Sequence, residues 1–347
     1  MPTNTPNINI PKPLGTETVS RSAFNAIWDL IDGLFSHVSG HDHTARGKLI
    51  PAAALAADVA RTNLLVNGGF EIAQRGVGPF TASATYGLDK WLNFLNGGST
   101  FSVTQIASTI GYKGKSAQFV YTHAAGGTAS LAQQLIELGL QLAGKTLALS
   151  VKVKSTAIGT VHVRIVDSTG STSSAVNVGT GEETLTVTRT IDAGATFMTA
   201  EVDFDTASCT VEINDAMLAI SSVPVDYVPL TPFEDLARCL RYCWALTLPA
   251  STPTWMGWSP QATSAYFLIH FPVPMAVAPS MTATAADWDV SDFWSYTVGV
   301  TALSLDKSRP DGGRLVVGVA SGLTVMGPCG LSTDATAGRK IIFEANP

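Results

Sequence analysis

Apolar and polar residues alternate along much of the middle of the chain. Leu147, Leu149, Val151 and Val153, for example, are separated by Ala, Ser and Lys residues. Successive side chains of a β-strand point to opposite faces, so this period of two predicts strands with one buried face. Similar runs occur at 101–106, 117–121, 161–165, 185–191, 197–204 and 210–220. Segments rich in Gly, Ser, Thr and Asp separate these runs, which predicts an antiparallel β-sandwich or jelly roll over residues 63–232.

A second set of β-rich runs follows a short helical pattern. Leu236, Leu240 and Trp244 recur at helical spacing, which predicts a helix over 233–244. Beyond this helix, strands are predicted at 265–273, 280–288, 293–300, 314–319 and 339–344. We therefore expect residues 233–347 to form a second antiparallel β-sandwich or jelly-roll domain, joined to the first by the helix, in a chain that is mainly β.

The first 62 residues show a different pattern. Residues 1 to about 18 are rich in Pro and Asn and can bury little apolar surface alone, so we expect them to become ordered against a partner. Between 19 and 39, five apolar residues are spaced like the a and d positions of a heptad: Phe24, Ile27, Ile31, Leu34 and Val38. This predicts a coiled-coil-like helix that packs against copies of itself. We favour a three-helix bundle, although the pattern alone does not fix the number of helices; the alternative is an amphipathic helix packed on its own domain. An Ala-rich linker then leads to the first β domain.

A His-x-His pair, His41 and His43, follows the predicted helix. In an extended chain the two imidazoles share one face, and three copies around a threefold axis would present six of them. Such a set suits a divalent metal ion. The alternative is a pair of solvated histidines in a turn.

Composition narrows the range of partners. Charged residues make up 14% of the 347 residues, against roughly 25% in average soluble domains, and the mean hydropathy is +0.23. This favours surface buried between subunits, although an uncharged β surface gives the same composition. The net charge of −6 and the lack of a basic cluster argue against nucleic-acid binding. No signal peptide is expected, because residues 1–10 lack a charged n-region and an apolar h-region. No membrane insertion is expected, because no apolar run reaches the ~18 residues of a membrane helix.

Four cysteines are present, and none of them forms a CxxC pair. Cys239 and Cys243 lie four residues apart on the predicted helix, without a His or Cys partner at zinc-finger spacing. We expect buried free thiols, which fits assembly in a reducing cytoplasm.

Four sequence blocks lie in or directly after the first β region, and a fifth lies in the C-terminal β region: Asn63–Gly76, Tyr86–Trp91, Leu142–Ser155, Leu230–Trp244 and Phe271–Ser280. In order and approximate spacing they resemble the β-sandwich module of tailed-bacteriophage fibre and appendage proteins, which is itself similar to carbohydrate-binding domains. The resemblance covers about half of the chain. It implies a carbohydrate-binding-like jelly roll in a virion protein that is assembled in the host cytoplasm. It also implies that residues 1–20 dock on phage portal, neck, tail or capsid proteins.

The same resemblance implies a structural calcium ion. In related carbohydrate-binding modules, an Asn-x-x-Phe-Glu turn and a late acidic pair often hold this ion, and the matching positions are Asn67, Glu71 and Asp215. Carboxylate oxygens are hard ligands that calcium prefers. Asn214 stands where those modules often carry a second Asp, and Asn67-Gly68 is also a strong turn signal, so turn chemistry is the alternative.

Tryptophan is concentrated in the C-terminal part, with five of the seven residues in 244–294. Exposed aromatic rings stack on sugar faces, and a carboxylate accepts hydrogen bonds from sugar hydroxyls. The glycan-binding candidates are Trp255, Trp258, Trp288, Trp294 and Asp289, the first two in a stretch expected to be a loop. The alternative is that these rings are buried in the core or in a subunit interface, where Trp is common.

Three functions are compatible with these patterns. The preferred one is a non-enzymatic, homotrimeric virion fibre, on the tail or the head, whose β domains adhere to host-surface polysaccharide. The second is a purely structural head or collar decoration protein without glycan binding. The third, a polysaccharide depolymerase, needs two convergent carboxylates, and Asp287 and Asp289 would share one face of a strand. No long β-helix repeat is visible, so we expect no enzymatic activity.

Overall fold

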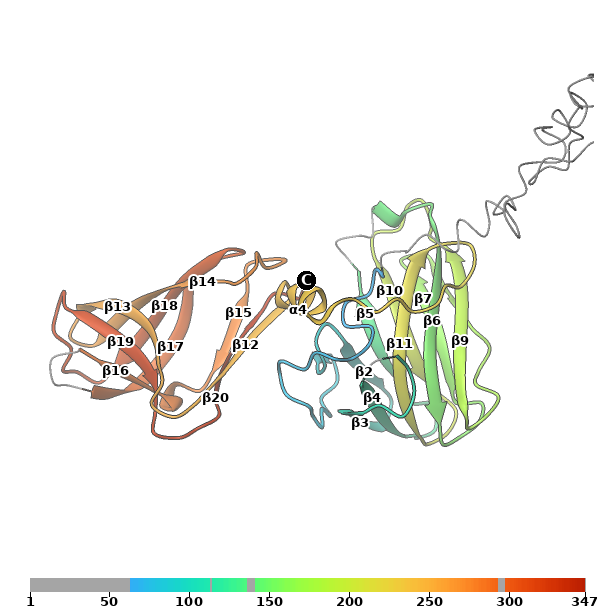
Figure 1. Ribbon diagram of the computed structural model, residues 1–347, viewed down its shortest axis with the longest axis horizontal. Helices are drawn as coiled ribbons and strands as arrows, with labels where there is room; N and C mark the ends of the chain where they lie inside the picture. The colour runs from blue at the N-terminus through green and yellow to red at the C-terminus, as the bar shows by residue number, and fades with distance from the viewer. Residues whose placement is uncertain (1–62, 113, 136–140, 293–296, 347) are drawn as a thin grey trace, which may run out of the picture. The chain divides into compact units, whose positions relative to one another are not determined.

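The computed structural model describes residues 63–112, 114–135, 141–292 and 297–346 (Figure 1). The predicted docking segment, the heptad helix and the His41/His43 pair lie outside these residues, as does Trp294. Residues 61–347 form one compact unit. Within it, two separate hydrophobic cores are built from residues 65–218 and from residues 244–345.

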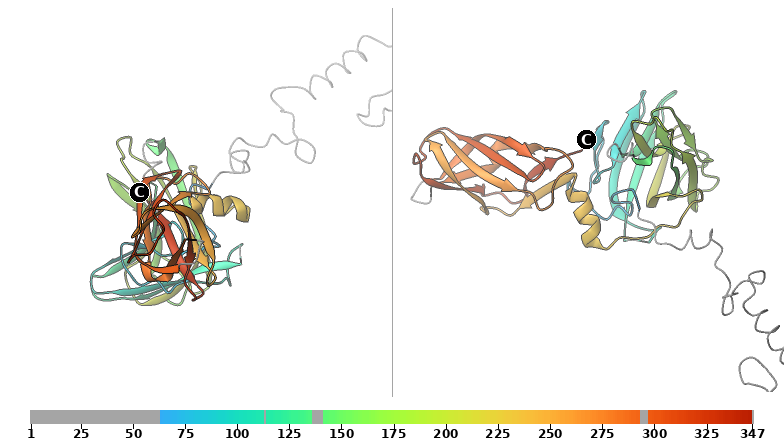
Figure 2. Two further views of the ribbon diagram at one scale, coloured as in Figure 1. Left: turned by 90° about the vertical axis from the view of Figure 1, so that its left-hand side faces the viewer. Right: turned by 90° about the horizontal axis from the view of Figure 1, so that it is seen from above.

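The first core lies between two antiparallel sheets, which confirms the predicted β-sandwich (Figure 2). The six-stranded sheet has the order β1 (Thr85–Tyr86), β2 (Leu92–Asn96), β5 (Thr128–Gln134), β10 (Met198–Phe204), β7 (Val161–Asp167) and β8 (Gly170–Ser173). The five-stranded sheet has the order β3 (Thr100–Ala107), β4 (Lys115–Thr122), β11 (Cys209–Ile220), β6 (Thr146–Ser155) and β9 (Glu182–Thr190).

Alternation along the strands decides which side chains fill this core. Leu147, Leu149, Val151 and Val153 of β6 are all buried, as the period of two predicts. Strand β11 departs from regular pairing, because its register with β6 shifts between Asn214 and Met217. Such a bulge re-aims the side chains on it.

A short helix, α4 (Pro232–Leu240), follows the sandwich. Thr231 and Glu234 form a capping box that satisfies its first backbone N–H groups, with Pro232 at the first helical position. The sequence predicts a helix that extends to residue 244. In the structure the helix ends earlier, and Cys243 and Trp244 begin strand β12 (Cys243–Leu248). Pairing explains the change, because Trp244 lies opposite Phe343 and their rings stack 5.3 Å apart.

The C-terminal part contains a closed barrel and a small sheet, where a second sandwich was predicted. The barrel has the order β13 (Pro253–Gln261), β14 (Ser264–His270), β18 (Gly312–Val319), β17 (Thr297–Arg309), β16 (Trp288–Ser291) and β19 (Pro328–Thr333). The sheet has the order β12, β20 (Arg339–Glu344) and β15 (Ser280–Ala283). Closure arises because β13 pairs with both β14 and β19, so the barrel leaves no free strand edge.

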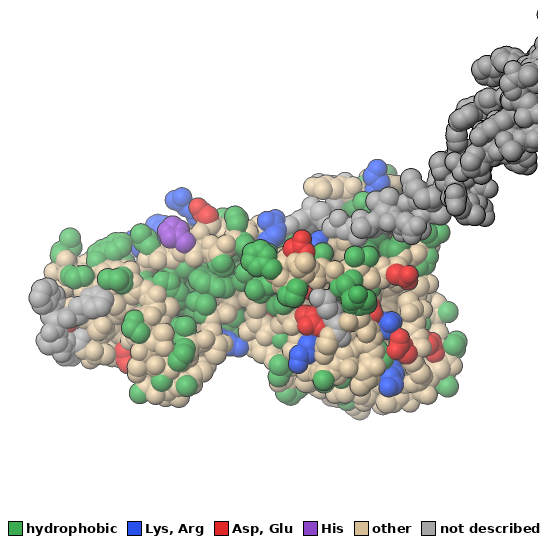
Figure 3. Space-filling view, in the orientation of Figure 1, with side chains coloured by type: hydrophobic (Ala, Val, Ile, Leu, Met, Phe, Trp, Pro, Cys, Tyr) green, Lys and Arg blue, Asp and Glu red, His purple; other side chains and the backbone are tan. Residues whose placement is uncertain are grey.

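The surface matches the low charged content of the sequence. On the face of the molecule drawn in Figure 3, charged side chains are few and scattered among apolar and uncharged polar ones. No described helix is both long enough and apolar enough to cross a membrane.

Candidate functional site

The predicted aromatic residues differ in what they expose. Trp255 and Trp258 lie on β13, which corrects the loop expected there. Trp258 is 38% exposed and meets the ring of Tyr266 edge-on at 5.7 Å. Trp255 is half-buried and packs 6.0 Å from Trp288. Trp288 is completely buried, so its selection as a glycan-binding residue is corrected: a ring without exposed surface cannot stack on a sugar.

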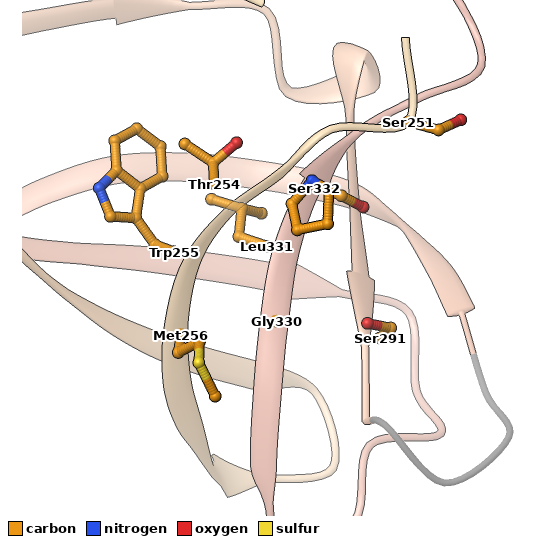
Figure 4. A pocket seen from close by; sticks show the side chains of 9 residues that line it. Ser251, Thr254, Trp255, Met256, Ser291, Gly330, Leu331 and Ser332 are labelled. Atoms are coloured by element: carbon orange, nitrogen blue, oxygen red, sulfur yellow. The ribbon is translucent and has the colours of Figure 1, made fainter. Parts of the chain in front are cut away.

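A pocket of about 400 Å³ opens on the outside of the barrel at the end of β13 where Trp255 lies. Met256 of β13 is opposite Gly330 of β19, and Gly330 is opposite Ser291 of β16. Directly opposed residues in an antiparallel sheet point to the same face. Met256 and Ser291 therefore flank a position that has no side chain, and Gly330 forms the hollow between them (Figure 4).

The lining combines apolar surface with hydroxyl groups. Met256 is 76% exposed and forms an apolar wall. None of the residues that line the pocket is charged. Four of them carry hydroxyl groups, namely Ser251, Thr254, Ser291 and Ser332. A hydroxyl both donates and accepts hydrogen bonds, so this lining suits an uncharged ligand that carries hydroxyl groups and C–H faces.

Asp289 lies beside this pocket but does not line it. It is half-buried on β16, opposite Ser332, whose hydroxyl points to the Asp289 backbone oxygen at 3.5 Å. Asp287 is in the 3-10 helix η1 (Ala285–Asp287) and pairs with Arg339 Nη1 at 2.8 Å. The depolymerase hypothesis expected Asp287 and Asp289 to lie on one face of the same strand. They do not, because Asp287 belongs to η1 and only Asp289 belongs to β16.

A charged row on the outer face of the six-stranded sheet was not singled out from the sequence. His162 and Arg164 of β7 lie opposite Asp203 and Glu201 of β10. Arg164 Nη2 is 2.6 Å from Glu201 and 2.8 Å from Asp203, and His162 Nε2 is 3.6 Å from Asp203. Burial, and then the charge of Glu201, raises the pKa of Asp203 to about 7, while burial lowers the pKa of His162.

The side chains expected to hold calcium serve other partners. The Asn67 side-chain N–H donates to the Ile72 carbonyl at 2.8 Å, and the Asn67 side-chain oxygen accepts the Ile72 backbone N–H at 3.0 Å. This is the turn that the sequence offers as the alternative to calcium binding. Glu71 accepts from the Lys115 N–H at 3.0 Å. Asp215 accepts from a backbone N–H and pairs with an ammonium group, which is a poor environment for a cation. The donor set as placed does not fit calcium, and the described residues contain no group of three or more His, Cys, Asp or Glu side chains suited to a metal ion.

No protein-family model matches the chain, and neither does any curated protein. Among solved structures, a putative sugar-binding protein from Bacteroides thetaiotaomicron is 14% identical over 46% of this chain and 100% of its own, with a TM-score of 0.35. The CBM22-1 xylan-binding domain of Paenibacillus barcinonensis Xyn10C is 14% identical over 47% of this chain and 98% of its own, with a TM-score of 0.33. The enzymatically active domain of tailspike protein 4 from bacteriophage CBA120 is 15% identical over 46% and 21%, also with a TM-score of 0.33.

Proposed function

We propose that this chain is a structural, non-enzymatic virion fibre protein that adheres to uncharged host-surface glycans through the barrel pocket. In this proposal residues 1–20 dock on the phage particle and the heptad helix holds three chains together. The observation that supports glycan binding is the lining of the pocket, in which the exposed Met256 stands among four hydroxyl side chains without any charge.

The chemistry of a sugar explains why this lining is suitable. A pyranose offers C–H faces to apolar side chains and hydroxyl groups to hydrogen-bonding partners. Each neutral hydrogen bond contributes only about 0.5–1.5 kcal/mol net, so a single shallow site binds weakly. Three sites on one trimer would compensate, because linked sites raise the effective concentration for the second contact.

Binding of the full-length chain to an array of bacterial surface polysaccharides in physiological saline tests the proposal. We expect a Met256→Ala/Ser291→Ala/Ser332→Ala variant to lose at least tenfold in apparent affinity, because it removes one apolar wall and two hydroxyl groups. Met326→Ala is the matched control, since Met326 is 77% exposed and does not line the pocket.

Two outcomes would overturn the proposal. If the wild-type chain binds no polysaccharide while remaining folded, a purely structural head or collar decoration protein becomes the better interpretation. If the wild type binds and the triple variant binds equally well, the barrel pocket is not the adhesion site. Release of reducing ends from a bound polysaccharide would instead support the depolymerase alternative.

A further inference from the structure

A second pocket, of about 240 Å³, lies on the sandwich domain. Separate segments of the chain converge on it: the loop between β3 and β4, strands β6, β9 and β11, and the segment between β11 and α4. Its lining residues are Tyr112, Ser150, Lys152, Thr184, Asp215, Asp226 and Tyr227. The volume is below the ~300–1,000 Å³ of pockets for drug-sized ligands, so it suits a single small unit.

The bulge in β11 determines where Asp215 points. Asp215 follows Asn214 at the register shift and has a φ of +49°, a left-handed conformation that non-glycine residues adopt rarely. Backbone of this kind is concentrated at functional sites, where the surrounding structure holds it in place. The bulge therefore aims a carboxylate into the pocket instead of continuing the in-and-out alternation of the strand.

Two contacts hold this carboxylate in one orientation. Its Oδ1 accepts the backbone N–H of Tyr112 at 2.9 Å, and its Oδ2 is 3.3 Å from the Lys152 ammonium. Lys152 is in turn 3.1 Å from Glu182. A carboxylate offers about four lone-pair directions, so Asp215 keeps acceptor capacity for a ligand after these contacts.

Two tyrosine rings supply the apolar part of the lining. Tyr112 is 74% exposed, and the Asp215 contact fixes its backbone at the rim of the pocket. Tyr227 is half-buried, and its pKa is raised by burial and by the nearby carboxylates of Asp235 and Asp215. Its phenol therefore stays protonated at neutral pH and can donate a hydrogen bond.

The charge of the lining restricts the ligand. Asp215 and Asp226 carry two negative charges against the one positive charge of Lys152. Asp226 is exposed, and no described residue hydrogen-bonds or ion-pairs with its carboxylate. A ligand with hydroxyl donors would satisfy these acceptors, whereas a carboxylate or phosphate on the ligand would be repelled.

We propose that this pocket is a separate binding site for one uncharged pyranose unit, which stacks on Tyr112 and donates hydroxyl groups to Asp215 and Asp226. It lies on a different domain from the barrel pocket and does not depend on that site. The chain would then carry two glycan sites, of which this one selects against acidic sugars.

Saturation-transfer NMR on the full-length chain tests this site with the methyl glycosides of glucose, galactose, mannose and N-acetylglucosamine. Methyl glucuronide serves as the anionic comparison. We expect transfer to at least one uncharged glycoside and none to the glucuronide. Tyr112→Ala and Asp226→Ala should each weaken that binding at least fivefold. Phe94→Ala and Asp311→Asn change an exposed ring and an exposed carboxylate elsewhere, and should leave binding unchanged.

The barrel triple variant separates this site from the proposed function. Retention of uncharged-glycoside binding in that variant, and its loss in Tyr112→Ala, would support a separate sandwich site whatever the barrel pocket does. Equal binding by wild type and Tyr112→Ala, preference for the glucuronide, or loss of binding in the barrel variant alone would each overturn the proposal. Unchanged thermal unfolding of each variant confirms that the fold is intact.

Discussion

The buried ion-pair group around Arg75 gives a sharp test of the energetics of this fold. The Arg75 guanidinium is 3.2 Å from Asp89 and 2.6 Å from Glu344 of β20, and the Asp89 side chain is completely buried. Arg75→Met keeps most of the apolar side-chain volume but leaves Asp89 without its cation. Removing one partner of a buried pair costs about 3–5 kcal/mol, because the remaining charge is uncompensated. This is a large part of the ~5–15 kcal/mol that stabilises a typical domain.

The pH dependence of the variant follows from the same contact. Burial already raises the pKa of Asp89, and Arg75 opposes this effect. Without Arg75, the folded-state pKa rises further above the unfolded value. A group whose pKa is raised on folding contributes stability that is present at low pH and is lost as pH rises through the folded-state pKa. The penalty of Arg75→Met should therefore be smaller at pH 5 than at pH 8.

Urea unfolding followed by tryptophan fluorescence measures these effects. Asp89→Asn in the Arg75→Met background should recover part of the lost stability, because it removes the uncompensated charge. Arg309→Met is the control: Arg309 is exposed, so its change should stay within about 0.5 kcal/mol. A loss below about 1 kcal/mol for Arg75→Met, or no recovery in the double variant, would show that the charge of Asp89 does not carry the effect.

Three further outcomes are expected. Burial raises the pKa of Asp203 to about 7, so the stability that this group contributes is present at acidic pH and is lost as pH rises through 7. Asn cannot titrate, so the urea midpoint of Asp203→Asn should fall less than that of wild type between pH 5 and 8. Trp288→Ala should destabilise the barrel by about 3–5 kcal/mol in the same assay, and Trp258→Ala by clearly less, since only Trp288 is fully buried. Light scattering should give a mass near three times 36.3 kDa, and Phe24→Asp/Ile31→Asp should reduce it to one chain; an unchanged mass would refute the heptad helix as the trimer contact.

Local periodicity was sufficient to predict the sandwich strands. Along β6, β7 and β11 the inward positions hold apolar residues, so the sequence pattern coincides with the buried face. The same reasoning failed at β13, where Pro253 and Pro260 suggested a loop. Pro253 is tolerated at the first position of this strand, where the ladder does not yet need its N–H.

The barrel could not be predicted because its closure depends on pairing between distant strands. β13 pairs with β19 as well as with its neighbour β14, and no local pattern shows that contact. Trp288 is buried because the barrel closes: its position on β16 points the side chain into the barrel core. The sequence shows a tryptophan beside acidic residues, but it does not show which side of the strand is enclosed.

The two candidate binding pockets also could not be predicted from the sequence, because residues far apart in the chain form them. The sequence suggests Asp215 as a calcium ligand, yet the place of its carboxylate follows from a bulge and from Tyr112, which lies 103 residues away. Nothing in the spacing of Tyr112, Asp226 and Tyr227 indicates that they meet. The two pockets differ in charge, one uncharged and one acidic, and neither is lined by an excess of cations. If the chain adheres to glycans as proposed, these two pockets would bind them through hydroxyl groups, carboxylates and ring faces, and weak contacts of that kind would gain from several linked copies.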